Sequence, residues 1–596
     1  MKSKTQRLLQ RSRFFGIGGV LTFFIWLMAI ASHAQTFTTL ADFDWTNGPA
    51  PWSALVQGTD GNFYGTANPV EIDCPYTRCG RVFKINQAGK LTVVRSFDGT
   101  DGAYPTGLVL ATDGNFYGTT VGGGVNLGCP NYGPGCGTVF KITPAGKLTT
   151  LYSFCSQGGK NCTDGAAPFA GLVQGTEGDL YGTTFGGGTG SACQGCGTVF
   201  KITPAGKLTT LYSFCSEGGA NCTDGAWPYP GALSQSSNGI FYGTTSGGGT
   251  YGAGTIFKIT AAGKLTTLYS FCPETNCTDG ENPGAPLVQS TDGNFYGITP
   301  SGGANSSACW GSGCGTIFTI TAEGKLTTLY SFCSQENCTD GALPEGLAFA
   351  TDGNLYGTTL NGGTNSSGCN GLGCGTVFQV TATGTLTTLH SFAQPDGAGP
   401  FRGVLQATTG TFFGATAWGG TNCNGNCGTI YSLSMGLGPF VTFVQASGKV
   451  GWKAEILGQG FTGTTGVSFN GTPGVAFVVK SDTYLRATVP AGATTGPVTV
   501  TTPSGTLTSN VPYRVRPTIL SFSPTSGPVG TQVTIMGVSL TQTTKVGFGG
   551  VPATQFTVNS DTQVTATVPS GAQTGKIAIT TPGGKTWSTG VFTVTQ

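Results

Sequence analysis

Short apolar runs separated by turn residues dominate the chain after residue 34. In residues 170–214, "AGLVQGTEG" leads by a turn into "DLYGTT", a glycine-rich loop follows, and then come "GTVFKIT", a "PAG" turn and "KLTTLYSF". Each run has six to eight residues rich in β-branched and aromatic side chains and is bounded by Gly, Asp, Asn or Pro, which is typical of β-strands. Phe200 and Ile202 alternate with Val199, so the strands are apolar on both faces. No helical periodicity appears after residue 34, and the pattern predicts an all-β protein with strands packed on both sides.

This four-strand pattern is repeated along most of the chain. The motif Tyr-Gly-Thr-Thr, or a near variant, begins at Tyr64, Tyr117, Tyr181, Tyr242, Tyr296, Tyr356 and Phe413. Residues 135–156 and 195–216 are identical, letter for letter. One unit cannot bury both faces alone, and seven units of four antiparallel strands predict a seven-bladed β-propeller over residues 35–435.

The seventh unit lacks a fourth strand of its own. Its third strand is "GTIYSLS" (428–434), after which the chain passes directly into "GLGPF". The missing pattern stands near the other end of the chain, as "TFTTLADF" (36–43). We therefore expect residues 36–43 to pair antiparallel with 428–434 and to close the ring, which would cover an exposed sheet edge.

Two further domains follow the propeller. Residues 467–505 match residues 546–584 at a fixed offset of 79, with short strands throughout. This predicts two β-sandwiches, at 436–516 and 517–596.

Both parts resemble known families. The pattern "GKLTTLYSF…DGA.P..GLV…DGNFYGTT..GG…GTVFKIT" resembles the GloVer tandem repeat of secreted bacterial proteins, a family named for its choice of C-terminal anchors. The paired C-terminal segments resemble the IPT/TIG immunoglobulin-like domain. These resemblances imply a secreted bacterial protein with spacer or binding modules, and they imply no particular biochemical activity.

The first 34 residues have the layout of a secretory signal peptide. A basic start is followed by the apolar run 14–31 and by Ser32-His33-Ala34 before Gln35. We expect cleavage near Ala34 and export to the cell surface or the medium; the alternative is that the segment is retained as a membrane anchor. Later in the sequence, every apolar stretch is too short to span a membrane.

Charge is scarce, which narrows the range of partners. Cleavage would leave 23 basic and 26 acidic residues, a net charge of −3, and only 9% of all residues are charged. There is no basic patch for phosphate contacts, so nucleic acid is not expected as a partner. An extracellular glycan or cell-surface component is the partner that we expect.

The 20 cysteines follow the loops of the repeat, and each long loop holds two or none. Within units the pairs are Cys74/Cys79, Cys129/Cys136, Cys193/Cys196, Cys309/Cys314, Cys369/Cys374 and Cys423/Cys427; between units they are Cys155/Cys162, Cys215/Cys222, Cys272/Cys277 and Cys333/Cys338. Loss in pairs predicts ten local disulfides, consistent with an oxidising compartment. Zinc is the alternative that Cys193-x-x-Cys196 suggests, but zinc needs four ligands and only His390 remains after residue 34.

Catalytic motifs are missing from the sequence. It has no nucleophile elbow, phosphate loop, HExxH motif or calcium loop. His390 takes the position of Tyr152 in its unit, which favours packing, and the repeated Asp164, Asp224, Asp279 and Asp340 sit in "TDG" turns. No catalytic residue, metal or cofactor is expected.

Aromatic residues that break the repeat mark the candidate ligand-binding face. Loops after second and fourth strands emerge on the same side, and these long loops carry Trp45, Tyr76, Tyr104, Tyr132, Trp227, Tyr251, Trp310 and Trp418. A second set stands where first strands begin, near the channel mouth: Trp52, Phe169, Tyr229 and Phe401. Exposed rings beside few charges suit sugar stacking, although they could equally cover the disulfides.

Two functions remain open. The first is a non-catalytic binding or adhesion protein that takes carbohydrate at the disulfide-bearing face. The alternative is an extracellular polysaccharide-acting hydrolase or lyase. Its acid and base would be non-repeated carboxylates such as Glu71, Asp73, Glu217 or Glu345.

Overall fold

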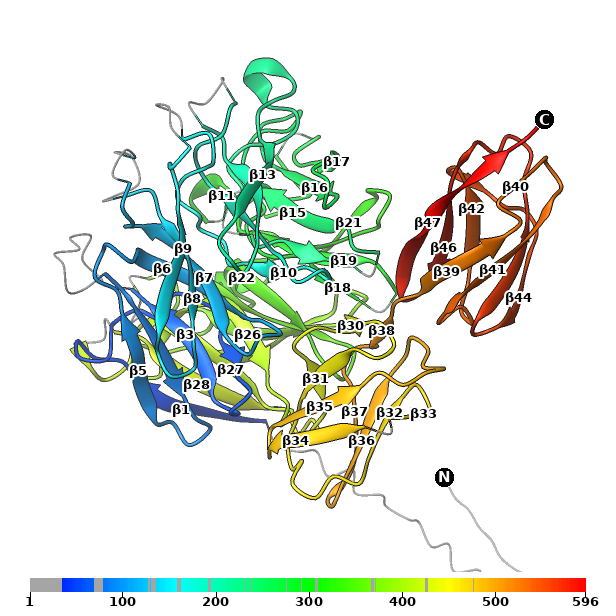
Figure 1. Cartoon of the computed structure of the whole chain (residues 1–596). Coiled ribbons are helices and arrows are strands. Elements are labelled where there is room, and N and C mark those ends of the chain that lie inside the picture. Colours follow the sequence, from blue (N-terminus) through cyan, green and yellow to red (C-terminus); the bar gives the residue numbers. More distant parts are fainter. Residues whose placement is uncertain are drawn as a thin grey trace, which may run out of the picture. The chain divides into compact units, whose positions relative to one another are not determined.

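The computed structural model describes residues 35–596, apart from 69–78, 127–128, 130–134, 158–161, 191–194, 230, 237, 275, 291, 306–308, 366–368, 370, 424–426 and 475, and it does not describe the side chains of 220 and 310. Within these ranges the regular structure is strands with short 3₁₀ turns such as Gly219–Asn221. The predicted all-β class is confirmed (Figure 1). None of the helical turns in this part of the chain is long or apolar enough to cross a membrane.

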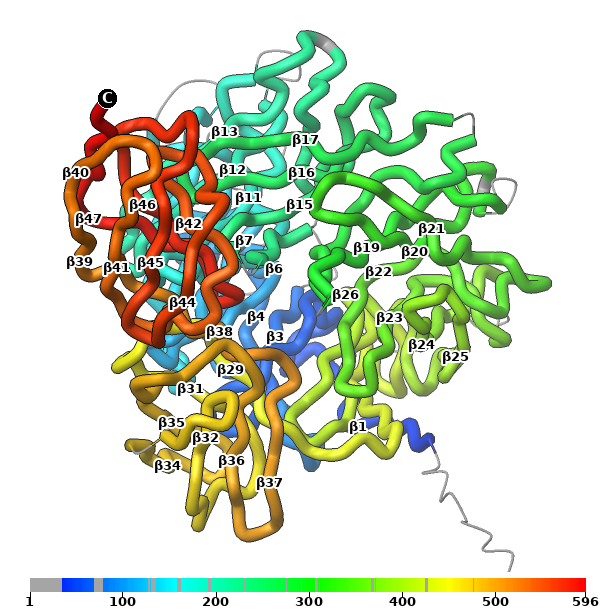
Figure 2. Tube along the Cα trace, turned by 90° about the vertical axis from the view of Figure 1, so that its right-hand side faces the viewer, coloured from blue at the N-terminus to red at the C-terminus, as the bar shows by residue number. Residues whose placement is uncertain are grey.

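Seven four-stranded antiparallel sheets form the blades of a propeller (Figure 2). In each blade the first strand lies nearest the centre and the fourth lies outermost. The strands of blades 1 to 3 are β2 (Val56–Gln57), β3 (Phe63–Ala67), β4 (Arg81–Ile85), β5 (Leu91–Ser96); β6 (Ala103–Leu110), β7 (Phe116–Gly122), β8 (Thr138–Ile142), β9 (Leu148–Ser153); β10 (Val173–Gln174), β11 (Leu180–Thr184), β12 (Thr198–Ile202) and β13 (Leu208–Ser213). Those of blades 4 to 6 are β14 (Ser234–Gln235), β15 (Phe241–Thr245), β16 (Thr255–Ile259), β17 (Leu265–Ser270); β18 (Val288–Gln289), β19 (Phe295–Thr299), β20 (Thr316–Ile320), β21 (Leu326–Ser331); β22 (Ala342–Phe349), β23 (Leu355–Asn361), β24 (Thr376–Val380) and β25 (Leu386–Ser391).

Aromatic contacts join each blade to the next. The second strands of blades 1 to 5 are buried along their whole length, and those of blades 6 and 7 are buried except at their last residues, because they pack on neighbouring blades at both faces. The ring of Tyr181 on β11 stacks on Phe241 of β15 at 4.0 Å, and Tyr242 stacks on Phe295 at 4.1 Å. The strands that were predicted to be apolar on both faces thus form the contacts between blades.

Blade 7 is completed by the N-terminal strand. It contains β26 (Ala398–Gln406), β27 (Phe412–Trp418), β28 (Thr429–Ser434) and β1 (Thr36–Asp42). Strand β1 runs antiparallel to β28, with Thr36 opposite Ser434 and Asp42 opposite Thr429. The ring of Phe37 stacks on His390 of blade 6 at 3.6 Å, so β1 also contacts the neighbouring blade.

The remaining chain forms two β-sandwiches, drawn in yellow and in orange to red in Figure 1. The first has β29 (Thr442–Phe443), β31 (Lys453–Leu457), β35 (Tyr484–Thr488) and β34 (Phe477–Ser481) in one sheet, β33 (Thr472–Pro473), β32 (Gly466–Phe469), β36 (Val498–Thr502) and β37 (Gly505–Thr508) in the other, and the pair β30 (Ser447–Gly448) and β38 (Arg514–Val515). The second has β39 (Thr518–Ser523), β41 (Gln532–Val538), β45 (Gln563–Thr567) and β44 (Phe556–Ser560) facing β40 (Ser526–Gly527), β47 (Gly584–Val594), β46 (Gly575–Thr581), β42 (Lys545–Phe548) and β43 (Val551–Pro552). Each sandwich has its own apolar core.

The first sandwich meets the propeller at turns between first and second strands. Thr483 Oγ1 donates to the carbonyl oxygen of Thr59 at 2.9 Å, and Gln445 Nε2 donates to that of Gly175 at 2.8 Å. These turns lie on the side of the blades opposite the disulfide-bearing loops, because successive strands alternate in direction. The disulfide-bearing side is therefore not the side that these contacts use.

We predict that Phe37→Ala lowers the stability of the propeller much more than Thr38→Ala does. Phe37 is half-buried and packs on His390, Phe392 and Tyr431, whereas Thr38 is exposed on the same strand. Loss of the ring should cost about 2–3 kcal/mol, and the Thr38 change should stay within about 0.5 kcal/mol. Thermal and urea unfolding of both variants measure this difference. Equal melting temperatures would contradict closure by β1.

Candidate ligand-binding site at the channel mouth

A repeated junction joins every pair of adjacent blades on the disulfide-bearing side. The residue before a proline adopts a left-handed backbone, and its N–H donates to a carbonyl oxygen at the end of the preceding blade's second-to-third-strand loop. Ala167, for example, has φ 52° and donates to the oxygen of Cys136 at 2.9 Å. The seven donor–acceptor pairs are Ala50–Cys427, Tyr104–Cys79, Ala167–Cys136, Trp227–Cys196, Asn282–Ala253, Leu343–Cys314 and Gly399–Cys374.

A glycine lies directly beneath each proline of this junction. It follows the acceptor residue in sequence, as Gly137 follows Cys136. A Cβ on Gly137 would lie 2.7 Å from Cδ of Pro168 and would also meet the backbone oxygen of Thr120, and the residue has φ 89°. A side chain at this glycine would fit neither the space nor the backbone angle, so the contact between glycine and proline recurs at every junction. We call this glycine, the proline and the backbone hydrogen bond of the junction the frame.

The residue after each junction proline varies, whereas the frame does not. These seven residues, which we call the mouth ring, are Trp52, Thr106, Phe169, Tyr229, Gly284, Glu345 and Phe401. The prolines are buried, but the four aromatic members of the ring are half-buried. The rings of Trp52 and Phe401 lie 4.8 Å apart, and those of Phe169 and Tyr229 lie 4.9 Å apart.

A cavity of about 250 Å³ lies between these two aromatic groups. Four mouth-ring residues line it, one from each of blades 4 to 7: Tyr229, Gly284, Glu345 and Phe401. A cavity reached from four consecutive blades lies at the central axis of the propeller. The remaining lining comes from Ser246, Asn282, Ile298, Pro300 and Pro344.

Glu345 gives this cavity its only carboxyl group among the lining residues. Burial raises the pKa of Glu345 to about 7, although the positive charge of Arg402 acts in the opposite direction. A carboxyl group with a pKa near neutrality can donate or accept a proton, or hydrogen-bond in either form, at physiological pH.

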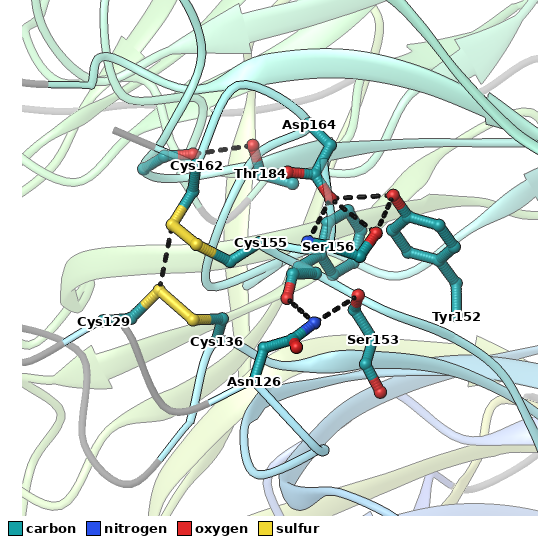
Figure 3. The surroundings of a disulfide bond; sticks show 12 residues. Asn126, Cys129, Cys136, Tyr152, Ser153, Cys155, Ser156, Cys162, Asp164 and Thr184 are labelled. Atoms are coloured by element: carbon teal, nitrogen blue, oxygen red, sulfur yellow. Dashed lines mark hydrogen bonds between the residues drawn. A yellow bond between two sulfur atoms is a disulfide. The ribbon is translucent and has the colours of Figure 1, made fainter. Parts of the chain in front are cut away.

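Two neighbouring disulfides, shown in Figure 3, adjoin the junction between blades 2 and 3. The bridge Cys129–Cys136 fixes the acceptor Cys136, and the bridge Cys155–Cys162 closes the loop that leads to the donor Ala167. The two bridges touch, with Cys129 Sγ 3.4 Å from Cys162 Sγ. The disulfides thus restrain the backbone that presents the mouth ring.

Eight of the ten predicted bridges lie within the described residues, and their partners are those expected. Cys79 and Cys196 are also disulfide-bonded, while Cys74 and Cys193 fall outside the described residues. Four sulfur atoms also lie close enough to hold one metal ion in blade 2 and again in blade 5. However, Cys272–Cys277 and Cys369–Cys374 form bridges in blades that have no second pair, so the unit that recurs is the two-cysteine bridge.

The predicted loop aromatics divide into two groups. Trp227 and Trp418 are partly exposed and flank the mouth ring: Trp227 precedes Pro228-Tyr229, and Trp418 packs beside Gly399, two residues before Phe401. Trp45 and Tyr251 are exposed but do not line the cavity. Tyr104 is a half-buried junction residue. Tyr76 and Tyr132, and the side chain of Trp310, lie outside the described residues.

The repeated aspartates hold the loops together. The Tyr152 hydroxyl donates to Asp164 Oδ2 at 2.7 Å, and the backbone N–H of Ser156 donates to the same oxygen at 2.9 Å. His390 Nε2 lies 2.9 Å from Asp396 Oδ2 and takes the place of that tyrosine in blade 6. These contacts agree with a structural role for both residue types.

Sequence reasoning missed Phe185 and Arg402. The ring of Phe185 lies 5.5 Å from Phe169 and 5.6 Å from Tyr229, which extends one aromatic group. The guanidinium carbon of Arg402 lies 4.6 Å from the centre of the Phe401 ring. A basic residue in a nearly uncharged repeat was the available signal for Arg402.

Comparisons with known proteins identify the repeat. The family model of the Gloeobacter/Verrucomicrobia repeat matches residues 26–191 and 195–369, more than half of the chain, and the IPT/TIG domain model matches residues 517–594. The chain belongs to this repeat family, and the recognised C-terminal domain is the second sandwich. None of the curated proteins matches the sequence.

Solved structures are similar only at a distance. The extracellular domain of a hybrid two-component system from B. thetaiotaomicron is 11% identical with a TM-score of 0.40, covering 94% of this chain, and this chain spans 56% of that one. A fungal alcohol oxidase of the AA5 family, in complex with copper, is 12% identical with a TM-score of 0.39, covering 94% and 99% of the two chains. The surface glycan-binding protein PbSGBP-B from Prevotella bryantii is 18% identical with a TM-score of 0.20, covering 26% and 41%.

We predict that Gly137→Ala destabilises the propeller far more than Gly178→Ala. Both glycines have positive φ, 89° and 98°, but a Cβ at Gly178 would meet nothing within 4 Å. The open position should lose about 1 kcal/mol from backbone strain, and the junction position about 3 kcal/mol or more because Pro168 must move. Thermal unfolding compares the two variants, and equal losses would show that the Gly-Pro contact does not govern stability.

Proposed function

We propose that this protein is an extracellular, non-catalytic carbohydrate-binding protein whose ligand docks at the channel mouth. The mouth ring carries the proposal: in a frame repeated seven times, four of the seven variable positions are aromatic, and two of these rings face one cavity. Half-buried rings suit the apolar faces of sugars, and isolated polar groups in the lining can fix their hydroxyls. The local disulfides fit an oxidising compartment.

The loop aromatics extend this surface outward. Trp227 and Trp418 stand next to the mouth ring, so they would contact neighbouring sugars of a longer chain. Trp45, Tyr104 and Tyr251 belong to the same loop face but do not line the cavity, so we assign them no contact with the ligand. Tyr76, Tyr132 and the side chain of Trp310 lie outside the described residues.

A polysaccharide-acting enzyme is the second candidate, and Glu345 favours it. A carboxyl group with a pKa of about 7 in an aromatic cavity resembles a general acid. Hydrolysis by the usual mechanisms needs a second carboxylate opposite the first. Glu217 is exposed in a loop and does not line the cavity, and Glu71 and Asp73 lie outside the described residues. We therefore favour binding, and incubation of polysaccharides followed by a reducing-end assay tests for cleavage.

We predict that Tyr229→Ala and Phe401→Ala each weaken glycan binding about 5- to 30-fold, since burial of an aromatic ring contributes on the order of 1–2 kcal/mol. Trp227→Ala and Trp418→Ala should have smaller effects. A glycan array identifies ligands, and isothermal titration calorimetry measures each variant.

Tyr251→Ala is the matched control, because Tyr251 is an exposed aromatic residue of blade 4 that does not line the cavity. Its affinity should equal that of the parent, and all variants should melt at similar temperatures. Equal losses at Tyr251 and Tyr229, or lower melting temperatures that account for the lost binding, would overturn the proposal.

A further inference from the structure

Arg402 breaks the pattern of the repeat at the channel mouth. The residue that follows the mouth-ring residue is small and buried in blades 1, 3 and 5, where it is Ser53, Ala170 and Ala285. In blade 7 it is an arginine with a left-handed backbone, φ 70°. Strand β26 has an irregular register here, between Pro400 and Val404. Arg402 therefore combines a strained backbone with a side chain that differs from its counterparts in the other blades.

Close backbone packing brings Arg402 beside Glu345. A Cβ on Gly346 would lie 3.0 Å from both the carbonyl carbon and the oxygen of Arg402, so a side chain here would crowd this contact between blades 6 and 7. The guanidinium group lies against Phe401, whose ring also contacts Trp52. Arg402 is thus held between the ring of Phe401, which lines the cavity, and the backbone of blade 6.

No hydrogen bond or ion pair joins either side chain to another residue in the described part of the chain, although each charge influences the other. Both residues keep part of their surface exposed. A guanidinium group in the interior is costly unless a partner compensates its charge. An arginine whose donors have no protein partner is available for a planar anion, which it can bind through two parallel hydrogen bonds.

We propose that Arg402 recognises the carboxylate of an acidic sugar, so that the ligand at the channel mouth is a glycan containing uronic acid. This inference rests on the proposed function. The sugar ring would pack between Tyr229 and Phe401, and its carboxylate would compensate the charge of Arg402.

Glu345 makes this recognition depend on pH. Within this cluster the charge of Arg402 acts on Glu345, and Glu345 and Tyr229 both act on Arg402. Because burial raises the pKa of Glu345 to about 7, it is largely neutral at pH 6 and largely ionised at pH 8. Sugar carboxyl groups titrate at about 3–4, as α-carboxyl groups do, and stay ionised throughout this range. At pH 8 the carboxylate of Glu345 would compete for Arg402 and repel the ligand, so binding should strengthen as the pH falls from 8 to 6.

The test compares oligomers of galacturonic, glucuronic and mannuronic acid with their methyl esters, which have the same chain but no charge. Calorimetry at pH 6 and 8 uses the full secreted chain. We expect the parent to prefer at least one acid over its ester by about 10- to 100-fold at pH 6, and by less at pH 8. Arg402→Gln should lose this preference but bind the ester as the parent does, and Arg402→Lys should restore part of it.

Two further variants sharpen the result. Glu345→Gln should keep the pH 6 preference at pH 8, because no carboxylate competes. Lys90→Gln, which removes an exposed positive charge from the turn between the third and fourth strands of blade 1, should change nothing.

Retained preference in Arg402→Gln, or a preference for sulfated over carboxylated glycans, would overturn this inference. In that case binding that still depends on Tyr229 would leave the proposed function standing. If no neutral or acidic glycan binds at all, the proposed function fails as well.

Discussion

The junction between blades is the interaction on which the rest of the structure depends. Seven backbone hydrogen bonds, each from a left-handed residue before a proline, tie the start of one blade to a loop of the blade before it. Each is worth only about 1 kcal/mol, and the left-handed conformation itself costs a similar amount for a residue other than glycine. Their importance is geometric, because they set where each first strand begins and which residue next faces the channel.

Because the junction is made by backbone atoms, a glycine and a proline, the residue that follows can change freely. Trp52, Phe169, Tyr229, Glu345 and Phe401 all stand on the same frame and differ in chemistry. Disulfides add restraint on both sides of the junction without being essential to it. At the start of blade 5, Asn282 donates to Ala253, which takes the place of a cysteine. A rigid frame with variable residues at its mouth is well suited to holding a binding surface in place.

Scarcity of charge gives the few interior charges their significance. Tyrosine–aspartate pairs and backbone contacts satisfy the polar groups of the loops, and they do so in repeated positions. Glu345 and Arg402 have no such repeated counterparts. Their desolvation cost falls on two adjacent blades, and each charge offsets part of the cost of the other.

The sequence by itself determined the blades, their number, the two sandwiches and the paired use of cysteine. These features depend on local patterns, namely two-residue alternation, turn residues and a motif that recurs every 53 to 64 residues. The strand pattern of residues 36–43 was also readable, because a missing fourth strand and a surplus one could be matched without any contact. The repeat also placed Tyr229 and Phe401 near the channel mouth, but only the tertiary structure decided that they share one cavity with Glu345. Tyr229, Glu345 and Phe401 come from different blades, and their spacing depends on how the ring closes. Two other contacts are likewise long-range: the one between Gly346 and Arg402, and the one between the bridges of Cys129 and Cys162. Each depends on packing between segments whose order along the chain does not specify their distance.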